Sequence, residues 1–112
     1  MKIYAISDMH GQLDRLDPDG VDLVVVGGDF AIMRGLGIWH MNDQVKWINR
    51  QFSAWCAKYP EADFCVIPGN HDLFAQHPEV PAKPEFPPNV HYICNDVTAV
   101  RAMEELRKRG LV

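Results

Sequence analysis

The run Asp22-Leu23-Val24-Val25-Val26-Gly27-Gly28-Asp29 decides the fold, because it is an apolar strand that ends abruptly at glycines and an acid. A continuous β-branched run is apolar on both faces, and such strands are typical of buried, mostly parallel sheets. Similar apolar runs occur at residues 2–7, 64–67 and 90–94. The sequence therefore predicts four strands.

A helix is predicted over residues 42–59, between the second and third strands. Apolar side chains recur there at three- and four-residue steps and so share one helix face: Val45, Ile48, Phe52, Trp55 and Tyr59. Asn42 or Asp43 is a suitable N-cap, and Pro60 ends the helix. Residues 30–41 contain two glycines and no helical period, so they are predicted to form a loop.

A second helix is predicted near the end of the chain, after a proline-rich loop at residues 78–88. Its apolar residues recur at three-residue steps: Val97, Val100, Met103 and Leu106. Asn95, Asp96 or Thr98 is available as its cap, and Gly110 suits its end. Alternation of strands and helices indicates an α/β fold with a mostly parallel sheet. We expect one domain over residues 1–112.

The composition excludes several classes of protein. The net charge of −4 does not indicate a nucleic-acid backbone as partner. No apolar run is long enough to cross a membrane. The three cysteines are odd in number and none has C-x-x-C spacing, which argues against a disulfide framework and a structural zinc site. A cytoplasmic location is the natural expectation.

Polar residues follow three of the four predicted strands directly. Asp8 and His10 follow the first strand, Asp29 the second, and Asn70-His71-Asp72 the third. Because the carboxyl ends of parallel strands share one edge of the sheet, we expect these side chains to converge. Carboxylate, imidazole and amide groups together suit divalent manganese, iron, zinc or magnesium.

The spacing of these residues also favours a metal site. Asp8 and His10 are two positions apart, so in an extended chain their side chains point to the same side. Asp29 has two oxygens and can bridge two cations, and paired cations clamp a phosphate and generate a hydroxide nucleophile. Gly69-Asn70-His71-Asp72 is expected only about 0.001 times by chance in a chain of this composition.

Asp8-Met9-His10, Gly28-Asp29 and Gly69-Asn70-His71-Asp72 resemble the first three motifs of the calcineurin-like metallophosphoesterases. The resemblance covers about residues 1–95 and implies the N-terminal half of an αββα sandwich with two facing sheets. It implies that Asp8 and His10 hold one metal, that Asp29 bridges two, and that Asn70 ligates the second and touches a phosphate oxygen. His71 would then stabilise the transition state or protonate the leaving group.

Family members also carry a later histidine and a Gly-His-x-His motif, whereas no histidine follows His91 here. We therefore expect a domain shortened at its C-terminus that holds one or two divalent ions. Among the remaining histidines, His40 is the best candidate for a further site-facing residue. Otherwise it is expected to lie on the surface or at a helix entry. Asp72 is expected to cap a helix or to orient His71.

Two functions remain open on these grounds. The first is a hydrolase, a metal-dependent phosphoesterase that cleaves a phosphate mono- or diester through a metal-activated water. The alternative is a non-catalytic half-domain that binds metal weakly and acts through self-association or a partner. A sheet apolar on both faces needs cover on both, so we expect a homo-oligomer or a partner chain over the open face. Otherwise the terminal helix folds across that face and the chain is a monomer.

Overall fold

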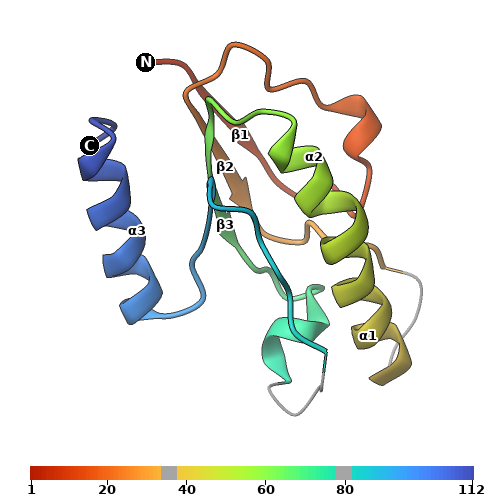
Figure 1. Cartoon of the computed structure of the whole chain (residues 1–112). Coiled ribbons are helices and arrows are strands. Elements are labelled where there is room, and N and C mark those ends of the chain that lie inside the picture. Colours follow the sequence, from red (N-terminus) through yellow and green to blue (C-terminus); the bar gives the residue numbers. More distant parts are fainter. Residues whose placement is uncertain (34–37, 78–81) are drawn as a thin grey trace.

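The structure, a computed structural model, describes residues 1–33, 38–77 and 82–112 and contains one four-stranded sheet (Figure 1). Its strands are β1 (Ile3–Ile6), β2 (Leu23–Gly27), β3 (Asp63–Ile67) and β4 (Val90–Tyr92). They lie in the order β1-β2-β3-β4, and every neighbouring pair is parallel. The predicted α/β fold with a parallel sheet is confirmed.

The helical elements are η1 (Leu13–Arg15), α1 (Ile38–Trp47), η2 (Ile48–Phe52), α2 (Ser53–Ala57), η3 (Leu73–Gln76) and α3 (Asp96–Lys108). The segments α1, η2 and α2 follow one another without a break, and η2 is a π-helical stretch. This helix begins at Ile38, so the loop predicted over residues 30–41 is wrong for its last four residues. Its first turn already buries His40, and tertiary packing there overrides the weak local period. No helix in the described ranges has the length and apolar character needed to span a membrane.

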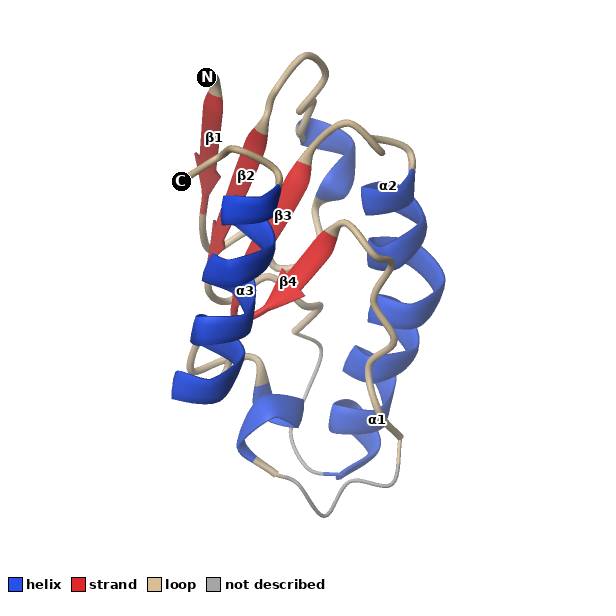
Figure 2. Cartoon of the chain, turned by 60° about the vertical axis from the view of Figure 1, so that its left-hand side comes forward, coloured by secondary structure: helices blue, strands red, loops and turns tan. Residues whose placement is uncertain are grey.

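Helices cover both faces of the sheet, with α1 and α2 on one face and α3 on the other (Figure 2). The larger core lies under α1 and α2, where Val24, Val26 and Phe64 are fully buried. On the opposite face, Leu106 of α3 packs with Leu23 and Cys65 of the sheet. The terminal helix thus folds across the sheet face for which either this helix or a partner chain was expected as cover.

The apolar residues whose spacing indicated α3 do not share one face of it. Leu106 is 4% exposed, whereas Val97 is 59% and Val100 is 58% exposed. Each three-residue step rotates a helical side chain by about 300°, so three such steps carry it to the opposite side. Of the three predicted caps, Asn95 is the N-cap: its side chain accepts the main-chain N–H of Thr98 in a capping box.

A buried charge cluster fixes the end of α3 to the sheet. The Asp63 carboxylate is 1% exposed and accepts a hydrogen bond from His91 Nε2 at 2.8 Å. Arg109, the C-cap residue of α3, forms an ion pair with the same carboxylate. Because a buried carboxylate is costly without partners, this contact defines where α3 can dock.

We expect Leu106→Ala to lower the free energy of unfolding by about 2–5 kcal/mol, because it opens a cavity under α3. Val97→Ala on the exposed side of the same helix should change it by no more than about 0.5 kcal/mol. Urea denaturation followed by tryptophan fluorescence measures both values. Equal losses in the two variants would contradict this placement of α3.

Candidate metal centre

The loops that follow β1 and β2 run side by side at the carboxyl edge of the sheet. The main-chain N–H of Asp8 donates to the carbonyl of Gly28 at 3.0 Å, and that of His10 donates to the carbonyl of Asp29 at 3.0 Å. The pairing of β1 with β2 therefore continues beyond the strands. As a result, Asp8 and His10 are held next to Asp29, as the strand order predicts.

Three residues of this edge have left-handed backbone conformations, with φ of +53° at Asp8, +44° at His10 and +50° at Asp29. In the described part of the chain, no other non-glycine residue has a positive φ. Such residues cost on the order of 1–3 kcal/mol each and cluster at functional sites. The chain is not extended here, so the argument from alternating side chains is wrong, and the left-handed turns set the orientation instead.

Gly69 leaves the space that Asp29 occupies. A Cβ at Gly69 would lie 2.3 Å from Asp29 Oδ1 and 2.5 Å from the Asp29 main-chain nitrogen. A Cβ at Gly28, where φ is +102°, would lie 3.1 Å from Gly69 Cα. The loops after β2 and β3 can approach this closely only because both positions are glycine.

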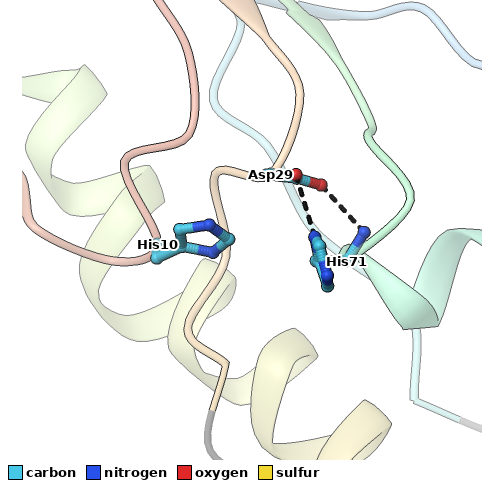
Figure 3. A group of neighbouring side chains, drawn as sticks. All are labelled: His10, Asp29 and His71. Carbon is cyan, nitrogen blue, oxygen red and sulfur yellow. Dashed lines mark hydrogen bonds and ion pairs between the residues drawn. The ribbon is translucent and has the colours of Figure 1, made fainter.

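His10, Asp29 and His71 form a compact group, in which one potential ligand atom from each lies within 4.8 Å of the others. Figure 3 shows Asp29 above the rings of His10 and His71, with both of its marked contacts directed to His71. The Asp29 carboxylate accepts hydrogen bonds from His71 Nδ1 at 3.0 Å and from the His71 main-chain N–H at 2.8 Å. His10 Nδ1 is buried and has no hydrogen-bond partner among the described residues.

The charges of this group are coupled. Burial raises the pKa of Asp29, but hydrogen bonds from the ring and main chain of His71, the charge of that ring and a hydrogen bond with Asp8 bring the pKa below its usual value. The hydrogen bond to Asp29 and its negative charge raise the pKa of His71, and Asp72 and Asp8 add to this effect. Asp8 therefore belongs to the same electrostatic group.

We expect the Asp29–His71 pair to stabilise the metal-free protein within a limited pH range. Because the pKa of Asp29 is lowered, its contribution is present above about pH 4 and is lost as the pH falls through the folded-state value. Because the pKa of His71 is raised, its contribution is complete below about pH 6.5 and is lost as the pH rises through the folded-state value.

The melting temperature of His71→Gln in EDTA should therefore lie furthest below that of the wild type between about pH 4 and pH 6.5. The difference should narrow as the pH rises through the folded-state pKa of His71, because the imidazole then becomes neutral in both the folded and unfolded states. Parallel curves over the whole range would show that the pair carries no linked charge.

The remaining predicted residues lie in different surroundings. Asn70 is exposed in the loop after β3, and its side chain makes no hydrogen bond with the described residues. Its role as a ligand stays a prediction. His40 is 4% exposed within α1 and is not part of the group formed by His10, Asp29 and His71.

Asp72 occupies the N-cap position of η3, as predicted, but its carboxylate is used elsewhere. It is fully buried, and its carboxylate accepts the main-chain N–H groups of Gly69 at 2.7 Å, Ala31 at 3.0 Å and Phe30 at 3.3 Å. Asp72 precedes η3, but its side chain makes no capping hydrogen bond to that helix. It instead cross-links the loop after β2 to the loop after β3.

Gln44 of α1 also contacts both of these loops, and no sequence pattern indicated this contact. A glutamine next to an apolar helical stripe is expected to face solvent, yet this side chain is fully buried. The packing of α1 against η3 encloses it. Only that tertiary contact distinguishes Gln44 from the other polar residues of the helix.

A family model described as calcineurin-like phosphoesterase matches residues 1–107. The match contains all three motif loops and most of α3. No curated protein and no solved structure matches the chain.

Proposed function

Because the chain belongs to the calcineurin-like phosphoesterase family, we propose that it is a metal-dependent phosphoesterase that hydrolyses a phosphate mono- or diester. The observation that carries this proposal is the group formed by His10, Asp29 and His71 at the carboxyl edge of the sheet. These residues belong to three separate motifs, and the fold brings them together where ligands bind to parallel sheets.

The residues of this group fit a divalent cation. Imidazole nitrogens and a carboxylate are donors that manganese, iron and zinc accept. His10 Nδ1 is buried without a partner in the described part of the chain, which favours an ion because buried polar atoms rarely lack a partner. We propose that Asp8, His10 and Asp29 hold the first cation, and that Asp29 and Asn70 provide for a second.

When bound, a divalent cation would polarise the phosphate ester and lower the pKa of the attacking water. His71 is proposed to act on the substrate itself. Its Nδ1 is held by Asp29, which orients the ring and leaves Nε2 free to donate to a phosphoryl or leaving-group oxygen. Its side chain is 48% exposed, so a substrate at this edge can reach it, and its raised pKa favours the protonated ring.

Hydrolysis of p-nitrophenyl phosphate and of bis(p-nitrophenyl) phosphate tests this proposal. We expect the protein to hydrolyse at least one of the two esters, to lose this activity after EDTA treatment and to regain it with added Mn²⁺. Absence of hydrolysis, together with less than one bound metal ion per chain, would overturn it.

A second candidate function, self-association without catalysis, has one observation in its favour. Several apolar side chains stay exposed on α3 and on the sheet face that α3 covers: Ile3, Ile67, Val97, Val100 and Met103. Exposed apolar patches mark interaction sites in soluble proteins. Sedimentation equilibrium of the whole chain decides this point, since a dimer supports this candidate and a monomer at all concentrations rejects it.

A further inference from the structure

The side chain of Gln44 is fully buried, and its amide nitrogen and amide oxygen both have hydrogen-bond partners. Its Nε2 donates to the carbonyl oxygens of Ile32 at 3.0 Å and His71 at 2.8 Å. Its Oε1 accepts the main-chain N–H of Phe74 at 3.1 Å. One side chain from α1 thus connects the loop after β2, the loop after β3 and the first turn of η3.

The orientation of this amide follows from its partners. Carbonyl oxygens only accept and a main-chain N–H only donates, so the amide nitrogen of Gln44 must face Ile32 and His71, and its oxygen must face Phe74. Glutamate of the same length lacks the two donors, and an apolar side chain of the same size lacks all three groups. The position therefore requires an amide.

We propose that Gln44 is a positioning residue that sets His71 opposite Asp29 in the metal centre, an inference that rests on the proposed function. The main chain of His71 is held on both sides, because its N–H donates to Asp29 Oδ1 at 2.8 Å and its carbonyl accepts from Gln44. Through this bond, the position of α1 affects the position of the His71 imidazole.

The exposure of His71 makes this anchor important. About half of its side chain is open to solvent, so packing around the ring does not fix its position. The position of the ring depends on its edge contact with the His10 ring, on its bond to Asp29 and on the main chain that carries it. The Asp72 carboxylate holds the same loop to Phe30 and Ala31 by accepting their main-chain N–H groups. Because it is an acceptor only, it cannot hold the His71 carbonyl.

Gln44→Glu tests the inference, with Asn89→Asp as its matched control. Gln44→Glu keeps the acceptor for Phe74 and puts an oxygen against two carbonyls. Asn89 is likewise an amide whose Nδ2 ties down main-chain carbonyls, but at the amino edge of the sheet: those of Cys56, Tyr59 and Ala62, each at 3.1 Å. Both variants remove carbonyl-bound donors, so a general loss of stability affects them alike.

We expect Gln44→Glu to weaken Mn²⁺ binding by about 10–100-fold, because the His71 main chain that Gln44 holds donates to the proposed ligand Asp29, and residues that orient metal ligands usually have effects of this size. Asn89→Asp should leave Mn²⁺ affinity unchanged when both are compared at temperatures below their melting points. Where ester hydrolysis is measured, kcat should fall in Gln44→Glu while KM stays close to the wild-type value. Gln44→Met, which carries no charge, replaces Gln44→Glu if that variant does not fold.

Amide hydrogen exchange without metal gives a readout independent of activity. Exchange at residues 71–74 should be faster in Gln44→Glu than in Asn89→Asp. A wild type that binds no Mn²⁺ would overturn the proposed function. A wild type that binds Mn²⁺, together with a folded Gln44 variant of equal affinity and unchanged exchange at residues 71–74, would overturn this inference alone.

Discussion

Asp29→Asn is expected to weaken Mn²⁺ binding by at least about 100-fold and to abolish ester hydrolysis, because even residues that only orient ligands contribute about 10–100-fold. Asparagine has nearly the same shape, and its oxygen can still accept the main-chain N–H of His71. It offers no negative charge to a cation. Isothermal titration with Mn²⁺ measures the loss directly.

Asp43→Asn is the control for this change, since it removes an exposed carboxylate of α1 and the same unit of charge. We expect its Mn²⁺ affinity to stay within a few-fold of the wild type, as the long-range effect of one surface charge is screened. Asp29→Asn with wild-type affinity would place the ion elsewhere. In Asp29→Asn, the loss of the carboxylate charge beside the ring should also bring the pKa of His71 back toward its usual value.

Gly69→Ala is expected to destabilise the fold by about 1–3 kcal/mol and to remove metal binding, because the new methyl group overlaps Asp29. The nearest atoms are Asp29 Oδ1 at 2.3 Å and the Asp29 main-chain nitrogen at 2.5 Å. Moving the carboxylate away would break its hydrogen bonds to His71. Thermal unfolding and Mn²⁺ titration report the two effects separately.

Gly27→Ala provides a close control, since Gly27 ends β2 two residues before Asp29. A Cβ there meets only the Ile6 carbonyl at 3.5 Å and Ser7 Cβ at 3.7 Å, which are ordinary contacts. We expect Gly27→Ala to be neutral or slightly stabilising, because alanine restricts the unfolded chain. Equal damage from both substitutions would mean that the edge tolerates no side chain at all, and that Asp29 is not the specific reason.

The strands could be predicted because each is a short, largely apolar run, and the first three of these runs are closed by glycine, proline or an acid. Val24 and Phe64 are fully buried under α1 and α2, as such runs imply. The start of α1 at Ile38 could not be found in this way. Its first turn contains His40, which is buried by tertiary packing that no sequence period indicates.

The meeting of the three motif loops at one edge of the sheet could be predicted, but the geometry of the candidate site could not. Motif order and the parallel sheet placed Asp8, His10 and Asp29 at one edge. The left-handed conformations at these three residues depend on main-chain hydrogen bonds between two loops, which no local pattern encodes. The roles of Gln44 and Asp72 were missed for a related reason, since both bond to main-chain atoms far away in the sequence.

Histidine ring NMR during a Mn²⁺ titration tests most directly whether these loops enclose a cation. The paramagnetic ion broadens signals of nearby nuclei, and the chain has five histidines, so each ring can be followed. We expect the His10 and His71 signals to broaden at substoichiometric Mn²⁺. The signals of His91, which lies in β4 and is bonded to Asp63 of β3, should stay sharp. Unchanged His10 and His71 signals, or equal broadening of His91, would contradict a metal centre at this edge of the sheet.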